Sequence, residues 1–336
     1  MPDQDERNRL TPALLGTPAP HAVRVIASGL LEDVRAAHAR FEDDDADALH
    51  DLRVAMRRLR SWLRAFRPEL SDTVRGRTRR KLSALASATN EARDAEVALA
   101  FIERQTVLPA RARAAARAMV GELQKSCEDA ARDTRRAVGR DLPKAARALS
   151  SQLESWWECH RIDEPVSVRP MSAVFADAIR HQARRAESAL VHVDASSKAD
   201  DVHRARIAAK RLRYLLEPLG EELGAAEPVR LLRSMQQQLG DARDAHRIAT
   251  RFVREIGERA ARDARGRALT SAGIVPEGGG ERRDPTTGRA GLLELARRAH
   301  VARETAYSEF AAQWGKAELA ALVERIDDIA ARVAAG

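Results

Sequence analysis

Arginine and histidine side chains recur at helical spacing in two separate segments of the chain. In the first segment, His50 is followed by Arg53, Arg57, Arg60 and Arg64, at intervals of three or four residues. On a helix these intervals place the side chains on one face, because about 3.6 residues complete a turn. Guanidinium groups bind phosphate and carboxylate oxygens through paired hydrogen bonds. The first segment therefore predicts a helix that binds an anion.

The same pattern occurs again further along the chain. The matching residues, 153 positions after the first set, are His203, Arg206, Lys210 and Arg213. A second pair of blocks, residues 90–95 and 240–245, shares the sequence Ala-Arg-Asp-Ala at an offset of 150. Because both pairs stay nearly in register, the sequence predicts a tandem duplication of a helical unit.

These two basic segments hold all of the excess positive charge. The chain of 336 residues has a formal net charge of +8. Residues 50–67 contribute +5 and residues 203–213 another +5, so the remainder of the chain is slightly acidic. A solvent-exposed helix face usually mixes signs, because like charges three or four residues apart repel each other. A bound polyanion would relieve that repulsion, and we predict that the two segments bind one.

Two other classes of function stay open. The same guanidinium groups could bind a sugar–phosphate backbone, so DNA or RNA binding is the main alternative. The row of Arg, His and Lys side chains in each segment, here called its basic stripe, lacks aromatic residues for base stacking. The second alternative is a helical scaffold or granule-coat protein. No nucleophile, general base or metal-ligand set accompanies the motif, so we expect neither an enzyme nor a metal or other cofactor.

Composition and periodicity predict an all-α fold. Glycine, at 18 residues, and proline, at 13, are sparse, and apolar residues recur at helical spacing from His21 onward. Residues 1–17 are expected to form a flexible tail, followed by a first helical half (18–165) and a second (166–336), with a flexible loop at about 266–289. The helices are expected at 21–41, 47–67, 72–106, 109–139, 142–160, 171–193, 199–217, 226–262, 290–313 and 316–334.

Apolar residues lie opposite each basic stripe and are predicted to face the core. They are Leu52, Met56, Leu59, Leu63 and Phe66 in the first helix, and Ala205, Ala209, Leu212, Leu216 and Leu219 in the second. No apolar stretch is long enough to cross a bilayer, and the N-terminus is acidic and polar. We therefore expect a cytoplasmic protein without a membrane partner.

The doubled motif His-x-x-Arg-[Val/Ile]-Ala, closed by Arg-Leu-Arg, resembles the CHAD domain (conserved histidine α-helical domain) over residues 18–335. The resemblance implies two antiparallel helical bundles, related by a pseudo-twofold axis, that meet at a basic central groove or pore. It also implies binding of inorganic polyphosphate and association with polyphosphate granules. Some members carry a triphosphate-tunnel enzyme domain, whereas this chain resembles a stand-alone member.

The resemblance assigns polyphosphate contact to the residues of both motif helices. These are His50, Arg53, Arg57, Arg58, Arg60 and Arg64 in the first copy, and His203, Arg206, Lys210, Arg211 and Arg213 in the second. Secondary anion contacts are expected from Arg93, Arg243, Arg80 and Arg230. An Arg–Asp pair that fixes helix packing would explain Arg93 and Arg243 equally well. The second copy departs from the first where Glu217 stands in place of Arg64.

Overall fold

Helices account for nearly all of the residues that the structure describes. The computed structural model describes residues 8–42, 48–105, 107–159, 169–194, 197–273 and 285–335. Within these ranges no strand occurs, apart from an isolated bridge between Pro18 and Pro170. The prediction of an all-α fold is confirmed.

The chain forms two compact units that are interleaved in the sequence. Unit 1 comprises Met1–Asn90, Arg132–Gln237 and Ala311–Gly336, and unit 2 comprises Glu91–Ala131 and Gln238–Phe310. These boundaries do not coincide with the predicted halves 18–165 and 166–336, because each half contributes to both units.

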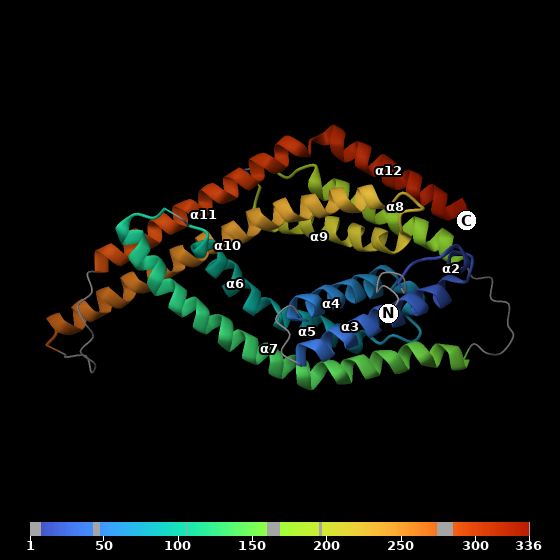
Figure 1. The fold of residues 1–336 in the computed structure, drawn as a ribbon, viewed down its shortest axis with the longest axis horizontal. Coiled ribbons are helices and arrows are strands. Elements are labelled where there is room, and N and C mark those ends of the chain that lie inside the picture. The colour runs from blue at the N-terminus through green and yellow to red at the C-terminus, as the bar shows by residue number, and fades with distance from the viewer. Residues whose placement is uncertain are drawn as a thin grey trace. The chain divides into compact units, whose positions relative to one another are not determined.

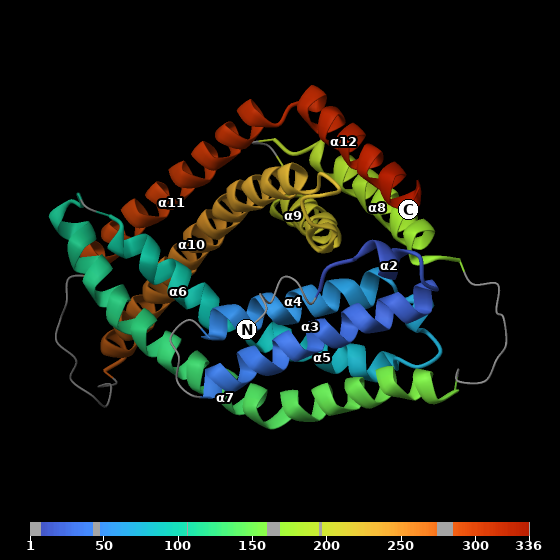
Figure 2. The same ribbon diagram turned by 45° about the vertical axis from the view of Figure 1, so that its right-hand side comes forward.

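Unit 1 contains both motif helices and the helices that position them. Its elements are α2 (Pro12–Leu15), α3 (Ala19–Glu42), α4 (Ala48–Ala65), η1 (Pro68–Leu70), α5 (Gly76–Ala88), α8 (Met171–Leu190), α9 (Ala199–Leu216), η2 (Glu217–Leu219) and α12 (Lys316–Ala335). The second part of α7 (Ala110–Cys159) and the first part of α10 (Ala226–Ser271) complete it. The helix α3 lies beside α4, and α8 packs against α9 and α12 (Figure 1, Figure 2). The motif helices α4 and α9 also contact each other.

The order of elements in unit 1 occurs twice, as α3–α4–η1–α5 and as α8–α9–η2–α10. The starts of α3 and α8 are joined by two reciprocal backbone hydrogen bonds. The Ala19 N–H donates to the Arg169 carbonyl at 3.1 Å, and the Met171 N–H donates to the Thr17 carbonyl at 2.8 Å. This order is what the predicted duplication requires, and the duplication itself stays a prediction.

Unit 2 has an apolar core of its own. It contains α6 (Asn90–Glu103) from Glu91 onward, most of α11 (Pro285–Gln313), the first part of α7 and the last part of α10. Phe101, Leu123, Phe252 and Leu292 are all buried there, and the Phe101 and Phe252 rings lie 6.4 Å apart. Burial of this apolar surface stabilises the unit.

The segment expected to be a flexible tail is partly folded. Residues 8–17 include α2, whose first turn is capped by the Thr11 hydroxyl, which accepts a hydrogen bond from the Leu14 N–H. Leu10 and Leu15 are buried, and the Leu10 N–H donates to the Pro218 carbonyl at 2.9 Å. Two apolar side chains and a backbone bond therefore hold residues that composition alone marked as loose; residues 1–7 lie outside the described ranges.

Several expected helix boundaries differ in the structure. The helix expected at 72–106 is divided into α5 and α6 at Thr89, while those expected at 109–139 and 142–160 form the single helix α7. Pro143 lies inside α7 and removes one backbone donor, but the buried side chains Val138, Leu142 and Ala146 keep this segment packed. The expected loop at about 266–289 is helical at both ends, since α10 continues to Ser271 and α11 begins at Pro285; residues 274–284 lie outside the described ranges.

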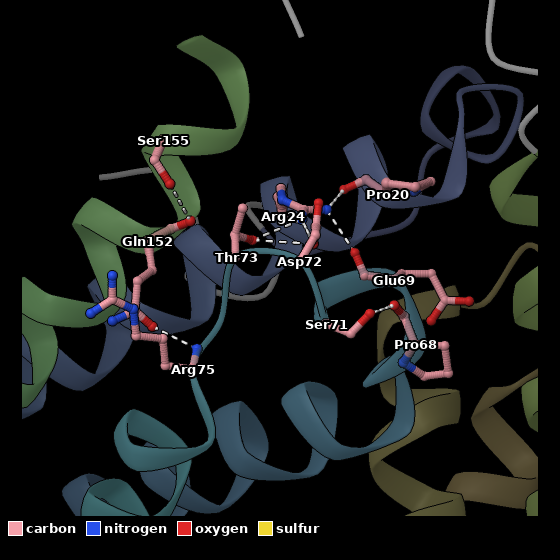
Figure 3. Close-up of polar contacts among 10 residues, drawn as sticks. All are labelled: Pro20, Arg24, Pro68, Glu69, Ser71, Asp72, Thr73, Arg75, Gln152 and Ser155. Atoms are coloured by element: carbon pink, nitrogen blue, oxygen red, sulfur yellow. Dashed lines mark hydrogen bonds and ion pairs between the residues drawn. The ribbon is translucent and has the colours of Figure 1, made fainter. Parts of the chain in front are cut away.

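A buried arginine fixes the segment that follows α4. Arg24 of α3 is fully buried, and its Nη1 donates to the carbonyls of Pro20 and Glu69, each at 2.8 Å. Its Nη2 donates to Asp72 Oδ1 at 2.7 Å and to Thr73 Oγ1 at 2.8 Å (Figure 3). Burial lowers the pKa of Arg24, and the Asp72 carboxylate opposes that shift. These bonds attach the η1 region to α3 and so hold the C-terminal end of α4 in place.

Candidate polyanion-binding site

The motif helices are amphipathic in the way their sequence predicts. In α4, Leu52, Met56, Leu59 and Leu63 are buried, as is Phe66 just after it. In α9, Ala205, Ala209, Leu212 and Leu216 are buried, as is Leu219 in η2. The predicted core faces are confirmed, and they fix the direction in which each basic stripe points.

The predicted contact residues differ in their exposure to solvent. His50 and Arg64 are exposed, and Arg53 is buried. The half-buried residues are Arg57, Arg58, Arg60, His203, Arg206, Lys210, Arg211 and Arg213. Most of the stripe therefore keeps part of its cationic surface accessible while its aliphatic stems are covered.

Arg53 does not belong to the accessible stripe. Its side chain is only 6% exposed, and its Nε and Nη2 both donate to the Thr89 carbonyl, at 2.9 and 2.6 Å. Thr89 caps the C-terminal end of α5, where backbone carbonyls lack helical partners. Arg53 therefore stabilises the break between α5 and α6, and it is the least accessible of the predicted contact residues; its contact with polyphosphate stays a prediction.

The accessible cations of α4 lie close enough to repel one another. Arg60 Nη2 donates to Ser83 Oγ of α5 at 2.7 Å, which fixes the direction of its side chain. Burial lowers the pKa of Arg60, and the positive charges of Arg64 and Arg57 lower it further. Three guanidinium groups thus share one part of the helix surface.

Arg64 also links the two motif helices electrostatically. On α9, the pKa of Arg211 is lowered first by burial, and then by the charges of Arg64 and Arg185. Arg185 is an exposed residue of α8 that the repeated motif does not include. We name the residues Arg57, Arg60, Arg64, Arg185 and Arg211 the cationic cluster.

The corresponding part of α9 is arranged around an aromatic ring. Arg213 occupies the place of Arg60 in the second copy, and its Nε donates to Gln236 Oε1 of α10 at 3.1 Å. Its guanidinium carbon lies 4.5 Å from the centre of the Tyr214 ring, and Lys210 Nζ lies 5.9 Å from that centre. Cations over a ring face are stabilised by its negative potential.

A carboxylate holds two of the predicted contact residues. Glu217 Oε2 accepts from Arg58 Nε of α4 at 3.2 Å, and Glu217 Oε1 accepts from Arg213 Nη1 at 2.5 Å. Arg58 and Glu217 also border a cavity of about 220 Å³ in unit 1, which Arg9, Arg233 and other residues complete. The pairs join α4 to the end of α9.

The secondary residues lie outside the cationic cluster. Arg230 is exposed and paired with Glu227 at 2.7 Å, and this hydrogen bond raises its pKa. Arg80 is exposed on α5. Arg243 belongs to unit 2 and is half-buried; Arg93 is in the same unit, and its side chain is not among those described. Their assignment as anion contacts stays a prediction.

The described residues offer neither a metal site nor a helix that could span a membrane. Among them, no group of three or more His, Cys, Asp or Glu side chains could hold a metal ion. Within the same ranges, every helix is too short or too polar to cross a membrane.

Comparisons with known proteins agree with the helical architecture. The family model of the CHAD domain matches residues 25–253. The crystal structure of the CHAD domain from the plant Ricinus communis is 21% identical, with a TM-score of 0.61, over 87% of this chain and 96% of that one. PptA from Streptomyces chartreusis is 16% identical, with a TM-score of 0.60, over 89% of this chain and 99% of that one. No curated protein matches.

Proposed function

The chain belongs to the CHAD domain family, and from this premise we propose that it binds inorganic polyphosphate through the accessible cations of α4 and α9. The proposal describes a cytoplasmic binding protein without catalytic activity, which associates with polyphosphate granules because it binds the polymer that forms them. The family's link to polyphosphate supplies the class of ligand, and the site supplies the physical reason.

The observation that carries the proposal is the position of Arg64. Its charge lowers the pKa of Arg60 on its own helix and of Arg211 on α9, so cations of both motif helices act on one another. Such an arrangement is unfavourable in the free protein, and a polyanion that crosses both helices would remove the repulsion. Guanidinium groups suit phosphate oxygens because they can donate two parallel hydrogen bonds.

Polyphosphate fits these residues better than a nucleic acid does. Single-stranded nucleic acids are bound largely by aromatic side chains that stack on the bases. The aromatic residues of this region, Trp62, Phe66 and Tyr214, are at most 7% exposed, and Trp62 Nε1 donates to the Val23 carbonyl. Polyphosphate needs only a row of cations. Binding to a sugar–phosphate backbone is the outcome against which the proposal is tested.

A competition experiment tests the proposed function. Labelled long-chain polyphosphate is titrated at near-physiological salt, with unlabelled polyphosphate, duplex DNA and single-stranded RNA as competitors. We expect polyphosphate to displace the probe most efficiently and to raise the melting temperature, because the ligand binds the native state. Tighter binding of either nucleic acid, or an unchanged melting temperature at saturating polymer, would contradict the proposal.

A further inference from the structure

The two copies of the motif differ at one charged position. Where α4 ends its stripe with Arg64, the second copy has Glu217, at the junction of α9 and η2. A carboxylate at this position has the charge of the proposed ligand, and it lies among the residues proposed to bind that ligand. Its contacts show what it does there.

Glu217 holds one guanidinium from each motif helix. It accepts from Arg58 of α4 and from Arg213 of α9 with different oxygens, at 3.2 and 2.5 Å. The side chains of Glu217 and Arg213 are 15% and 13% exposed, so this pair is shielded from solvent far more than an ordinary surface pair. Arg58 is more open, with 34% of its side chain exposed. Screening by water and salt is weaker for such partly buried pairs.

We propose that Glu217 is a built-in counter-anion that restrains binding of phosphate at this end of the site. The inference rests on the proposed function. The Glu217 carboxylate presents two oxygens to Arg58 and Arg213, as a phosphate group would. An entering phosphate must compete with Glu217 for these two guanidinium groups, whereas no carboxylate is among the charges that act on Arg60 and Arg211 of the cationic cluster.

The cavity beside Glu217 provides room for displacement of its carboxylate. Glu217 and Arg58 both border the cavity of about 220 Å³, which has space for several water molecules. A carboxylate that leaves Arg58 can therefore rotate into a hydrated space. Arg9 and Arg233, which border the same cavity, are exposed cations.

The substitution Glu217→Gln tests the proposal, because it removes the charge and keeps the shape of the side chain. We expect E217Q to bind polyphosphate about three- to tenfold more tightly than the unmodified protein, since the negative charge that competes with phosphate for Arg58 and Arg213 is gone. The slope of log K against log salt becomes steeper by about one unit, as for one additional phosphate contact. In the absence of ligand, E217Q melts at a lower temperature, because the partly buried pair with Arg213 loses its negative charge.

The control is Glu221→Gln, which removes a carboxylate that borders the same cavity but is exposed. We expect E221Q to change affinity by less than about twofold, because exposed charges are screened. In a background of Arg58→Gln, the gain from E217Q shrinks, since one of the released guanidinium groups is gone. Glu217→Asp, which keeps the charge on a shorter side chain, gives a smaller gain and serves if E217Q does not fold.

The outcomes separate this inference from the proposed function. Binding by the unmodified protein with no gain in E217Q or E217D supports the proposed function and overturns the inference, as does an equal gain in E221Q. Binding by E217Q alone supports the inference and contradicts the proposed function of the unmodified chain. Absence of polyphosphate binding in all variants overturns both.

Discussion

The helices α4 and α9 carry the same motif, but the charged groups around them are arranged differently. In α4, the stripe ends in the exposed Arg64, whose positive charge acts on Arg60 of the same helix. Just after α9, the matching position is Glu217, the first residue of η2, which holds Arg213 of α9 and Arg58 of α4. One end of the site is therefore repulsive and the other is already neutralised.

A further difference concerns the first arginine of each motif. Arg53 is buried and donates to the Thr89 carbonyl, whereas Arg206, its counterpart in α9, is half-buried. Identical residues at identical positions of a repeated motif thus differ in exposure. The repetition identifies the helix face, and the surrounding helices decide what each side chain on that face can do.

The largest expected effect is on the cations that the two copies share. The double substitution Arg57→Glu and Lys210→Glu reverses one half-buried charge on each helix. We expect it to weaken polyphosphate binding about 100-fold, because new carboxylates repel the ligand. The control reverses Arg136 and Arg147, two exposed residues of α7. Equal losses in both double variants, measured by titration, would indicate diffuse binding over the whole surface.

The next prediction compares how much the first arginine of each motif contributes to the free energy of unfolding. Arg53→Met leaves the Thr89 carbonyl without two charge-assisted hydrogen bonds, and we expect the free energy of unfolding to fall by about 2 kcal/mol. Arg206→Met is expected to cost less, because Arg206 is only half-buried. Denaturant unfolding measures both. Equal costs would remove the distinction between the two arginines.

Arg64 is expected to contribute more to binding than its exposure suggests. Arg64→Gln removes the cation that acts on both Arg60 and Arg211, and we expect affinity for polyphosphate to fall about tenfold. The same substitution is expected to raise the melting temperature of the free protein slightly, because it relieves repulsion. A variant with unchanged affinity would show that the repulsive end of the site is not where the polymer binds.

The smallest effect is expected outside the cluster. Arg230→Gln removes a cation that is already paired with Glu227 at the surface. We expect a change in affinity below about twofold and little change in stability, because exposed ion pairs contribute little. A loss comparable to that of Arg64→Gln would extend the site to the start of α10.

Periodicity predicted the fold class and the core faces well, because both follow from local spacing. Leu52 and Leu212 face the core because residues on one side of a helix are buried together. Contacts between distant segments could not be read in this way. The bond from Arg53 to Thr89 spans 36 positions, and the helical wheel placed Arg53 on the basic stripe because it contains no information on neighbouring helices.

Only part of the cationic cluster could be predicted, because local spacing shows which residues share a helix face but not which other helices lie beside it. Of the cationic cluster, the motif predicted Arg57, Arg60, Arg64 and Arg211, whereas Arg185 of α8 lies outside the repeated segment and was not predicted. Glu217 was visible as a departure from the repeat, while its two partners depend on how α4 packs against α9. A break was expected between residues 139 and 142, but the buried side chains Val138, Leu142 and Ala146 keep α7 continuous through this segment.

The interleaving of the two units has a consequence for synthesis of the protein. Unit 1 needs the segment 311–336, and unit 2 needs the segment 238–310, so neither is complete when the first half of the chain leaves the ribosome. At about 5–20 residues per second, the partners of α3 at residues 169–171 emerge roughly 8–30 s after Thr17 and Ala19. The apolar face of α4 can pack on α3 as soon as both are made, whereas the contacts of Trp62 and Phe66 with Phe175 form only after α8 has emerged.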